Sequence, residues 1–213
     1  MNGSPTRILA ATDGSERAAL AVRAAADLSL RAGARLHLVH VWQEPQLAMT
    51  LPAAVAGEYS RARERWKREA ADLLDEQTDR VRGTEATVAG AHLRKGRPAE
   101  EVVGLAEELG ADLVVVGSRG LGRVERLATG SVSEGIVHLA SRPTLVVRSG
   151  AGAWPPKDVV VGDDGSREAA RAAEVAARVG KLLEASVLLV SVYSSRLVSR
   201  PSGPRCRERL TCS

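Results

Sequence analysis

Residues 112–139 read DLVVVGSRGLGRVERLATGSVSEGIVHL, and they carry the clearest indication of the fold class. The run Leu113–Val116 is apolar without alternation, which is typical of a strand buried on both faces of a sheet. Val132, Ile136 and Leu139 recur at helical spacing. The segment therefore predicts a buried strand whose carboxyl end leads through a glycine-rich loop into a helix, as in parallel α/β sheets.

Glycines frame the loop between this strand and this helix. Gly117 and Gly120 are followed by Gly130 and the hydroxyl of Ser131. Open α/β sheets bind ligands beyond the carboxyl ends of their strands, and the unpaired N–H groups of a helix N-terminus attract anions. Glycine lets backbone amides approach a phosphate without a Cβ in the way. The loop therefore predicts a phosphate site.

Two better-known phosphate motifs do not fit this loop. A P-loop needs a lysine before its hydroxyl residue, whereas Ser131 follows Gly130 directly. The dinucleotide fingerprint follows the first strand of its sheet, whereas this loop follows the fourth. Positive charge could come from Arg119, Arg123 and Arg126 within the loop. Each of these arginines could also be an ordinary solvated surface residue.

Strand and helix patterns alternate along the first 148 residues. We expect strands near 7–11, 36–41, 86–93, 113–116 and 144–147, and helices near 16–31, 59–81, 98–109 and after the glycine loop. In the first helix, Ala19, Val22, Ala26 and Leu30 are expected on the buried face. The alternation predicts an α/β fold with a doubly wound, parallel, five-stranded sheet.

A repeat organises the chain. Residues 8–42 match residues 159–193 without a gap, so that Asp13-Gly14-Ser15 falls on Asp164-Gly165-Ser166. Repetition on this scale indicates a tandem. We therefore expect a first domain, a linker, a partial second copy truncated after its second strand, and a basic, disordered tail without helix or strand periodicity. Their bounds are 1–148, 149–157, 158–193 and 194–213.

Composition narrows the classes of function. The formal net charge of +4 equals that of residues 194–213 alone, where five arginines and one glutamate stand. A nucleic-acid partner is therefore not expected for the domain. No run approaches the roughly 20 apolar residues of a membrane span, and the first residues lack the apolar core of a signal peptide. Cys206 and Cys212 lie in the tail and predict no disulfide framework. A cytoplasmic protein is expected.

Three features together resemble the universal stress protein family in its tandem bacterial form: the segment ATDGS at 11–15, the glycine frame, and the closing strand TLVVR at 144–148. The resemblance implies a Rossmann-like sheet of order 3-2-1-4-5 with ATP across the tips of strands one and four. Mg²⁺ would be carried on the phosphates. Asp13 would hold the ribose and the backbone at Val41 would meet the adenine. The other positions implied around the nucleotide are Ala11, Gly117, Arg119, Gly120, Arg123, Gly130, Ser131, Val132 and Ser133.

Some of these roles have structural alternatives. Ser131 and Ser133 could cap the helix after the loop. Asp13, with Glu16 three residues later, could cap the first helix. Asp164 lies in a copy without a glycine loop, so we assign it only the capping role. The four histidines show no metal-ligand spacing on one helix and are expected to be structural. They are His37, His40, His92 and His138.

These features predict an ATP-binding regulatory protein of the stress response, which acts through nucleotide-dependent conformation or partner binding. The alternative is a slow nucleotide-hydrolysing or adenylate-forming enzyme on the same scaffold. No catalytic residue is assigned, because no general base or nucleophilic triad is visible, so we expect at most a weak ATPase. A non-nucleotide interaction module is a further alternative. Because the second copy lacks its pairing strand, we expect a homodimer through Thr144–Val147.

Overall fold

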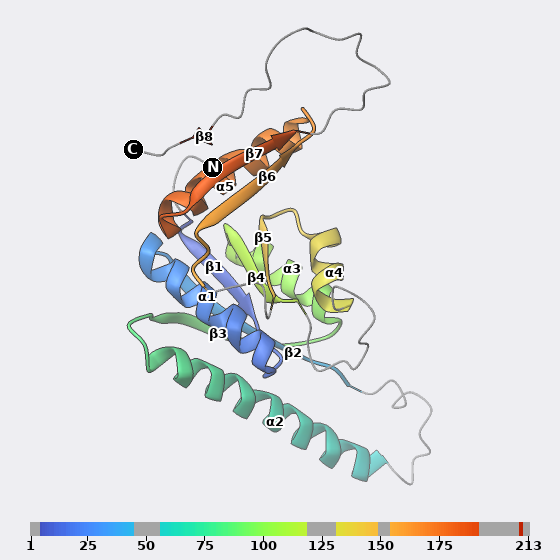
Figure 1. Cartoon of the computed structure of the whole chain (residues 1–213). Helices are drawn as coiled ribbons and strands as arrows, with labels where there is room; N and C mark the ends of the chain where they lie inside the picture. The colour runs from blue at the N-terminus through green and yellow to red at the C-terminus, as the bar shows by residue number, and fades with distance from the viewer. Residues whose placement is uncertain (1–4, 45–55, 119–130, 149–153, 192–208, 211–213) are drawn as a thin grey trace, which may run out of the picture. The chain divides into compact units, whose positions relative to one another are not determined.

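The computed structural model describes residues 5–44, 56–118, 131–148, 154–191 and 209–210. The chain divides into two compact units, Met1–Ala151 and Gly152–Ser213, each built from strands and helices (Figure 1). Among the helices that the structure describes, none combines the length and the apolar character that crossing a bilayer requires.

The first unit contains a five-stranded sheet of order β3-β2-β1-β4-β5. Every neighbouring pair of strands in it is parallel. This arrangement confirms the doubly wound α/β sheet and the strand order 3-2-1-4-5. The strands are β1 (Arg7–Ala11), β2 (Arg35–Trp42), β3 (Val88–Lys95), β4 (Leu113–Gly117) and β5 (Thr144–Val147).

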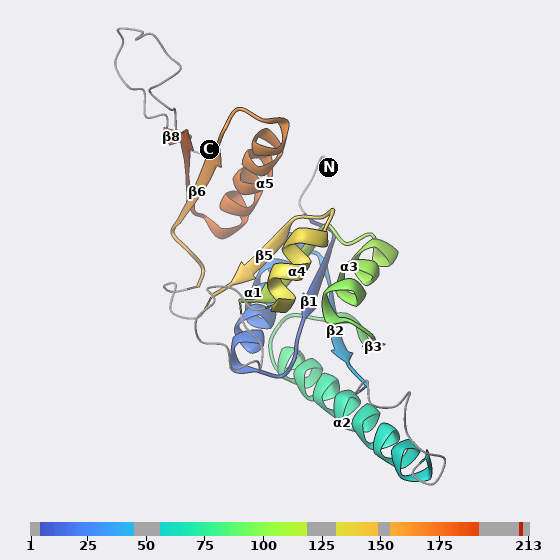
Figure 2. The same cartoon turned by 90° about the vertical axis from the view of Figure 1, so that its right-hand side faces the viewer.

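Helices cover both faces of this sheet (Figure 2). Two of them, α1 (Glu16–Ala32) and α2 (Ala56–Arg82), lie on one face. The other two, α3 (Pro98–Leu109) and α4 (Ser131–Leu139), lie on the opposite face and pack against each other. This layering follows from right-handed crossover connections between parallel strands.

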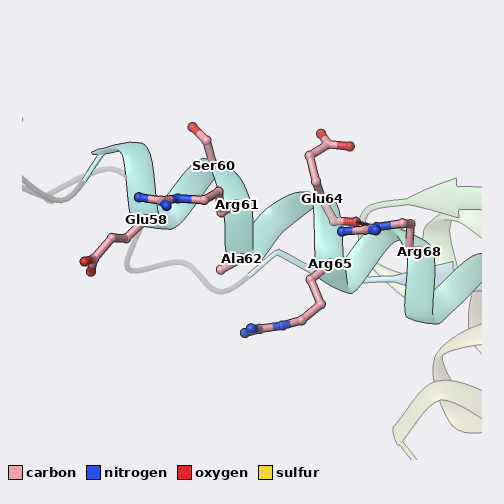
Figure 3. Close-up of a pocket in the computed structure, with 7 residues that line it drawn as sticks. All are labelled: Glu58, Ser60, Arg61, Ala62, Glu64, Arg65 and Arg68. Atoms are coloured by element: carbon pink, nitrogen blue, oxygen red, sulfur yellow. Dashed lines mark hydrogen bonds between the residues drawn. The ribbon is translucent and has the colours of Figure 1, made fainter.

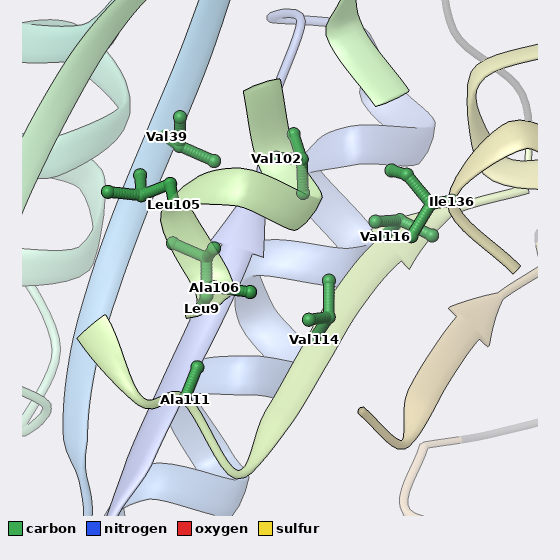
Figure 4. Packing of buried hydrophobic residues seen from close by; sticks show 9 residues of the cluster. All are labelled: Leu9, Val39, Val102, Leu105, Ala106, Ala111, Val114, Val116 and Ile136. Carbon is green, nitrogen blue, oxygen red and sulfur yellow. The ribbon is translucent and has the colours of Figure 1, made fainter. Parts of the chain in front are cut away.

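Small aliphatic side chains fill the core between the sheet and the α3–α4 layer (Figure 4). Every residue of Leu113–Val116 is buried, because β4 has helices over both of its faces. Burial on both faces explains why the sequence of this strand shows no alternation. The core cluster consists of Leu9, Val39, Val102, Leu105, Ala106, Ala111, Val114, Val116 and Ile136.

The predicted buried face of α1 is only partly right. Leu30 is 45% exposed, whereas Leu28 is buried. Ala24, Ala25 and Ala26 are buried in succession. The reason is that α1 contacts both the sheet and α2, so its buried surface is wider than the single stripe that periodicity describes.

The second unit repeats the beginning of the first. Its parallel pair β6 (Asp158–Asp163) and β7 (Ser186–Ser191) flanks α5 (Arg167–Leu183). A two-residue strand, β8 (Arg209–Leu210), adds to β7 in the antiparallel direction. The sequence predicted no strand in the tail, so the presence of β8 differs from the prediction. It arises because the open edge of β7 can pair with any extended segment, whatever its periodicity.

Candidate functional site

The carboxyl ends of β1 and β4 lie side by side in the middle of the first sheet, with Ala10 in register with Val115. From β1 the chain continues to β2 on one side, whereas β4 occupies the other side. This reversal is the topological switch point of a doubly wound sheet, and ligands bind in the crevice outside it. The candidate site is therefore at the ends of these two strands.

A tight turn follows β1 at this point. The N–H of Gly14 donates to Oγ1 of Thr12 over 3.2 Å, and the N–H of Ser15 donates to Oδ1 of Asp13 over 3.1 Å. Gly14 has a φ of +80°, and a Cβ added to it would lie 2.7 Å from Cδ1 of Leu73. The positive φ favours glycine here, and any larger residue would also displace the side chain of Leu73 on α2.

Asp13 is half-buried in this turn and does not cap α1. The N-cap is Ser15, whose side chain accepts a hydrogen bond from the N–H of Ala18 over 3.1 Å. The capping alternative for Asp13 is wrong, because the helix begins at Glu16 and its N-cap position is therefore the residue just before it.

The equivalent turn in the second unit corrects the prediction for Asp164. The N-cap of α5 is Ser166, which accepts from the N–H of Ala169 over 3.0 Å. Asp164 instead accepts from the N–H of Ser166 over 2.9 Å. Hydrogen bonds from Ser166 hold the pKa of the Asp164 carboxyl below its usual value. In both units the aspartate therefore accepts a hydrogen bond within the turn, and the serine two residues later caps the helix.

The carboxyl end of β4 packs tightly on the first turn of α1. A Cβ on Gly117 would lie 2.9 Å from the carbonyl oxygen of Arg17 and 3.2 Å from the nitrogen of Ala18. Ser118 follows in a buried position, where its N–H donates to the carbonyl of Val147 over 2.8 Å. Gly117 thus has a packing role that its expected place beside the phosphates did not reveal.

The three residues expected near the nucleotide at the start of α4 differ in their exposure to solvent. Ser131 is exposed, and Val132 is 40% exposed. Ser133 is only 3% exposed, and its hydroxyl donates to the carbonyl of Ser118 over 3.1 Å. The buried serine therefore joins the first turn of α4 to the end of β4, whereas Ser131 faces solvent at the helix N-terminus. A phosphate contact stays a prediction for both serines.

The end of β2 is tied to the turn after β1. Nδ1 of His40 lies 2.8 Å from the carbonyl oxygen of Thr12, and the N–H of Thr12 donates to the carbonyl of Val39 over 2.9 Å. Ala11 and Val41, both half-buried, pack against the edge of the core cluster. The two positions expected to line the site from β1 and β2 therefore come from the ends of neighbouring strands.

A charged and aromatic group borders Val41, and the sequence did not predict it. Trp42 is 8% exposed, and Nζ of Lys95 lies 5.6 Å from the centroid of its ring. Lys95 also forms an ion pair with Glu44, and Arg63 of α2 adds another at 3.4 Å. The hydrogen bond from Lys95 is the main cause of the lowered pKa of Glu44. The register between β2 and β3 creates this group.

Histidines form a pair away from the strand ends. Nδ1 of His37 and Nε2 of His92 lie 3.1 Å apart on the neighbouring strands β2 and β3. Burial is the main reason that the pKa of each ring is lowered, and the charge of the other ring and of Arg7 also lowers the pKa of His37. In the described part of the chain, no three His, Cys, Asp or Glu side chains converge as metal ligands.

Part of the expected site lies outside the described residues, namely Arg119, Gly120, Arg123 and Gly130. A hollow of about 690 Å³ occurs elsewhere, along α2 (Figure 3). It is lined by charged and small residues of this helix and by none of the described site residues. The candidate site lies instead at the strand ends, where β1 and β4 are neighbours at the switch point of the sheet.

Comparison with known proteins gives one consistent answer. The model of the universal stress protein family matches residues 5–148. Universal stress protein YxiE of Bacillus subtilis (strain 168) is 32% identical over 151 residues, which cover 67% of this chain and 98% of that protein. A universal stress protein of Thermus aquaticus is 36% identical over 146 residues, covering 66% of this chain and 97% of that protein.

Solved structures agree at the level of the fold. Universal stress protein UspA from Lactobacillus plantarum superposes with a TM-score of 0.61 at 24% identity, covering 69% of this chain and 100% of its own. A longer universal stress protein from Archaeoglobus fulgidus DSM 4304 gives a TM-score of 0.67 at 22% identity, covering 89% of this chain and 68% of its own. The second likeness extends beyond the residues that the family model matches.

Proposed function

Because this chain belongs to the universal stress protein family, we propose that its first unit binds ATP at the carboxyl ends of β1 and β4. The observation that carries the proposal is the position of the Asp13 turn at the switch point of the sheet. Doubly wound sheets bind ligands at that point, irrespective of the reaction or signal that follows.

The nucleoside would occupy the side of the site formed by β1 and β2. Asp13 would accept hydrogen bonds from the ribose hydroxyls, since a carboxylate accepts several at once. The half-buried position of Asp13 and its bond to Ser15 support this role, because both hold the carboxylate in one orientation. Ala11 and the backbone at Val41 would contact the adenine, next to Trp42.

The phosphates would lie between β4 and the N-terminus of α4. Ser131 and the first N–H groups of this helix are suited to an anion. The buried bond from Ser133 to Ser118 supports the role by fixing the helix relative to β4. Mg²⁺ would be carried by the phosphate oxygens, as is usual for this cation with nucleotides. The remaining positions proposed around the phosphates are Gly117, Arg119, Gly120, Arg123, Gly130 and Val132.

The output that we propose is regulation of the stress response through the nucleotide-bound state, with binding rather than turnover as the signal. A homodimer through β5 would accompany it. The support is that β5 is the last strand of its sheet, so among the described residues of the first unit Thr144–Val147 pairs with β4 alone. Pairing of edge strands is a common route to association between chains.

Calorimetric titration of the full chain with MgATP tests the proposal. Asp13→Asn keeps an oxygen for the N–H of Ser15 but removes the charge, and loss of a charged hydrogen bond should weaken binding by about 10-fold to 100-fold. Asp164→Asn makes the same change in the equivalent turn of the second unit and should leave the affinity unchanged.

Two results would overturn this function. One is a wild-type chain that gives no heat of binding with any adenine nucleotide. The other is an equal loss of affinity in Asp13→Asn and Asp164→Asn. A turnover of MgATP well above about 1 s⁻¹, at the low end of ordinary enzyme rates, would instead favour a catalytic role.

A further inference from the structure

Among the exposed charged side chains of α2, six form a line along the helix, which we call the α2 charge stripe. Its members follow one another at intervals of three or four residues, so they share one face of the helix. All of them are exposed, and the buried residues Ala70, Leu74, Gln77 and Val81 lie on the opposite face. The stripe consists of Arg61, Arg65, Arg68, Asp72, Asp75 and Asp79.

The stripe separates its charges by sign. Its first half is basic and its second half is acidic. Arg61 and Arg65 are four residues apart, as are Asp75 and Asp79, so like charges are neighbours on the helix surface and repel each other. A single solvated helix gains stability from opposite charges at this spacing. Opposite charges within the helix, such as the pairs Arg65–Glu69 and Arg82–Asp79, offset part of this repulsion, so the argument for the stripe depends on its match to a partner.

The same order is complementary to a second copy of itself. When two α2 helices lie antiparallel with residue 70 at the centre, Arg61 faces Asp79 and Arg65 faces Asp75. Arg68 then faces Asp72. A two-fold contact repeats each pair, since residue i meets residue j and residue j meets residue i. The matching covers about 27 Å of helix, from a rise of 1.5 Å per residue.

We propose that α2 is an interface between two copies of this chain, joined antiparallel through the charge stripe. The side chains of Arg65 and Asp79 are 64% and 71% exposed and so accessible to a partner. Their present partners are Glu69 at 3.8 Å and Arg82 at 3.1 Å within the same helix. Exposed pairs of this kind contribute little, so exchanging them for contacts across the interface is inexpensive.

The hollow along α2 belongs to this surface. Arg61, Arg65 and Arg68 line it together with Glu58 and Glu64, and they rise from successive turns of the helix (Figure 3). Its three arginines offer charged partners to the acidic half of a second stripe. The contact would be largely electrostatic, so its strength should fall as salt is added.

This interface is separate from the proposed β5 pairing. The helix α2 packs on β2 and β3, whereas β5 forms the opposite edge of the sheet. One chain can therefore use both surfaces, and a test of the stripe must not depend on β5. The weight-average mass meets this requirement, because exchange of chains through β5 leaves the average mass unchanged.

Sedimentation equilibrium of two charge-reversed full-length variants tests the interface. One variant carries Arg61→Glu, Arg65→Glu and Arg68→Glu, and its stripe is entirely acidic. The other carries Asp72→Arg, Asp75→Arg and Asp79→Arg, and its stripe is entirely basic. At an ionic strength of about 0.01 M, each variant alone should show a lower mass than the wild type, since one two-fold contact is lost.

An equal mixture of the two variants should regain the wild-type mass, because an acidic stripe matches a basic one along its whole length. At about 1 M salt, where charges are screened within about 3 Å, the mixture and the wild type should both lose this contact. A control with Arg23→Glu, Arg97→Glu and Arg171→Glu reverses three exposed arginines outside the stripe and should keep the wild-type mass.

Circular dichroism would detect misfolding of the triple variants. Two single substitutions test the same interface with less risk to folding. Arg61→Glu and Asp79→Arg should each lower the mass, and the double variant should restore it, since the two residues face each other across the interface. The proposal fails if the mixture of triple variants stays at the mass of its components. It also fails if the single and double variants are indistinguishable from the wild type.

Discussion

The hydroxyl of Ser133, in the first turn of α4, donates a hydrogen bond of 3.1 Å to the carbonyl of Ser118, the residue that follows β4. Both serines are buried. This bond holds the N-terminus of α4 beside the strand whose end borders the candidate site. The two hydroxyls of this turn therefore differ in environment, because Ser131 is exposed two residues earlier.

Alanine substitution of Ser133 and of Ser131 should affect two different properties. Ser133→Ala leaves the Ser118 carbonyl without this donor and should lower the free energy of unfolding by about 1–2 kcal/mol. Ser131→Ala should leave stability within about 0.5 kcal/mol of the wild type but weaken MgATP binding. Urea denaturation and calorimetric titration measure the two effects. Equal stability of the two variants would contradict this division.

Gly14→Ala and Gly165→Ala form a matched pair, because both glycines have a φ of +80° in equivalent turns. A Cβ at Gly14 meets Leu73 at 2.7 Å, whereas a Cβ at Gly165 meets nothing within 4 Å. Gly165→Ala should cost about 1 kcal/mol of backbone strain, and Gly14→Ala about 3 kcal/mol. Native-state hydrogen exchange of β1–α1 and β6–α5 reports each unit separately. If Gly14→Ala loses no more stability than Gly165→Ala, the side chain of Leu73 on α2 moves aside without a measurable loss of stability.

Gly117→Ala should disturb packing before it disturbs any ligand contact. Its Cβ would press on the carbonyl of Arg17, a backbone atom that cannot move aside without displacing α1. We expect a loss of stability of about 1–3 kcal/mol in the absence of nucleotide. Thermal unfolding without ligand measures this loss, and Gly162→Ala, where a Cβ has open space, is the control. A variant as stable as the wild type would leave the phosphates as the reason for this glycine.

Asp112 should make stability depend on pH in the acid range. Burial alone would raise the pKa of its carboxyl, but hydrogen bonds from the N–H and hydroxyl of Thr6 and from the N–H of Arg7 outweigh burial, and the pKa is lowered. The stabilisation is therefore complete above the ordinary value of 3.8 and is lost as the pH falls through the lowered value.

Asp112→Asn should accordingly cost about 1 kcal/mol near neutral pH, after allowance for solvent screening. The difference between variant and wild type should shrink as the pH falls below 3.8. Urea denaturation at several pH values measures both, with the exposed Glu85→Gln as a control. A difference that does not change with pH would show that the charge of Asp112 is irrelevant.

His37 and His92 should titrate below the ordinary histidine value of 6.5. The folded-state pKa is lowered, so the stability that the neutral rings contribute is present above 6.5 and is lost as the pH falls through the lowered values. His92→Gln removes a neighbouring charge that lowers the pKa of His37, so the midpoint of His37 should move back toward 6.5. Ring-proton NMR follows each titration, and an unchanged midpoint would contradict the coupling.

Local sequence patterns predicted most of this fold. The unbroken apolar run of β4 requires burial on both faces, and alternation of strands with helices leaves few arrangements other than a parallel sheet. Helix faces were harder to predict. Periodicity alone assumes one neighbour, whereas α1 packs on the sheet and on α2, so Ala24, Ala25 and Ala26 are all buried, and Leu30 lies outside this surface.

The candidate site was only partly predictable. The turn at Asp13 could be located from the sequence. Which of its residues caps α1 could not be predicted, since Asp13 and Ser15 are both residue types that cap helices well. The group formed by Trp42, Glu44 and Lys95 escaped prediction for another reason. It depends on the pairing of β2 with β3, in which Trp42 is in register with Lys95. The register between two distant strands cannot be predicted from the sequence of either strand alone.

The position of Trp42 gives the molecule a built-in optical probe. Trp42 directly follows Val41, and its indole is shielded from water. The ammonium group of Lys95 lies over the indole ring. The chain has only two other tryptophans, Trp66 and Trp154. With both replaced by phenylalanine, the remaining emission would come from the end of β2. Under the proposed function, a change in its intensity or wavelength on addition of MgATP would follow binding beside Val41 without an attached dye.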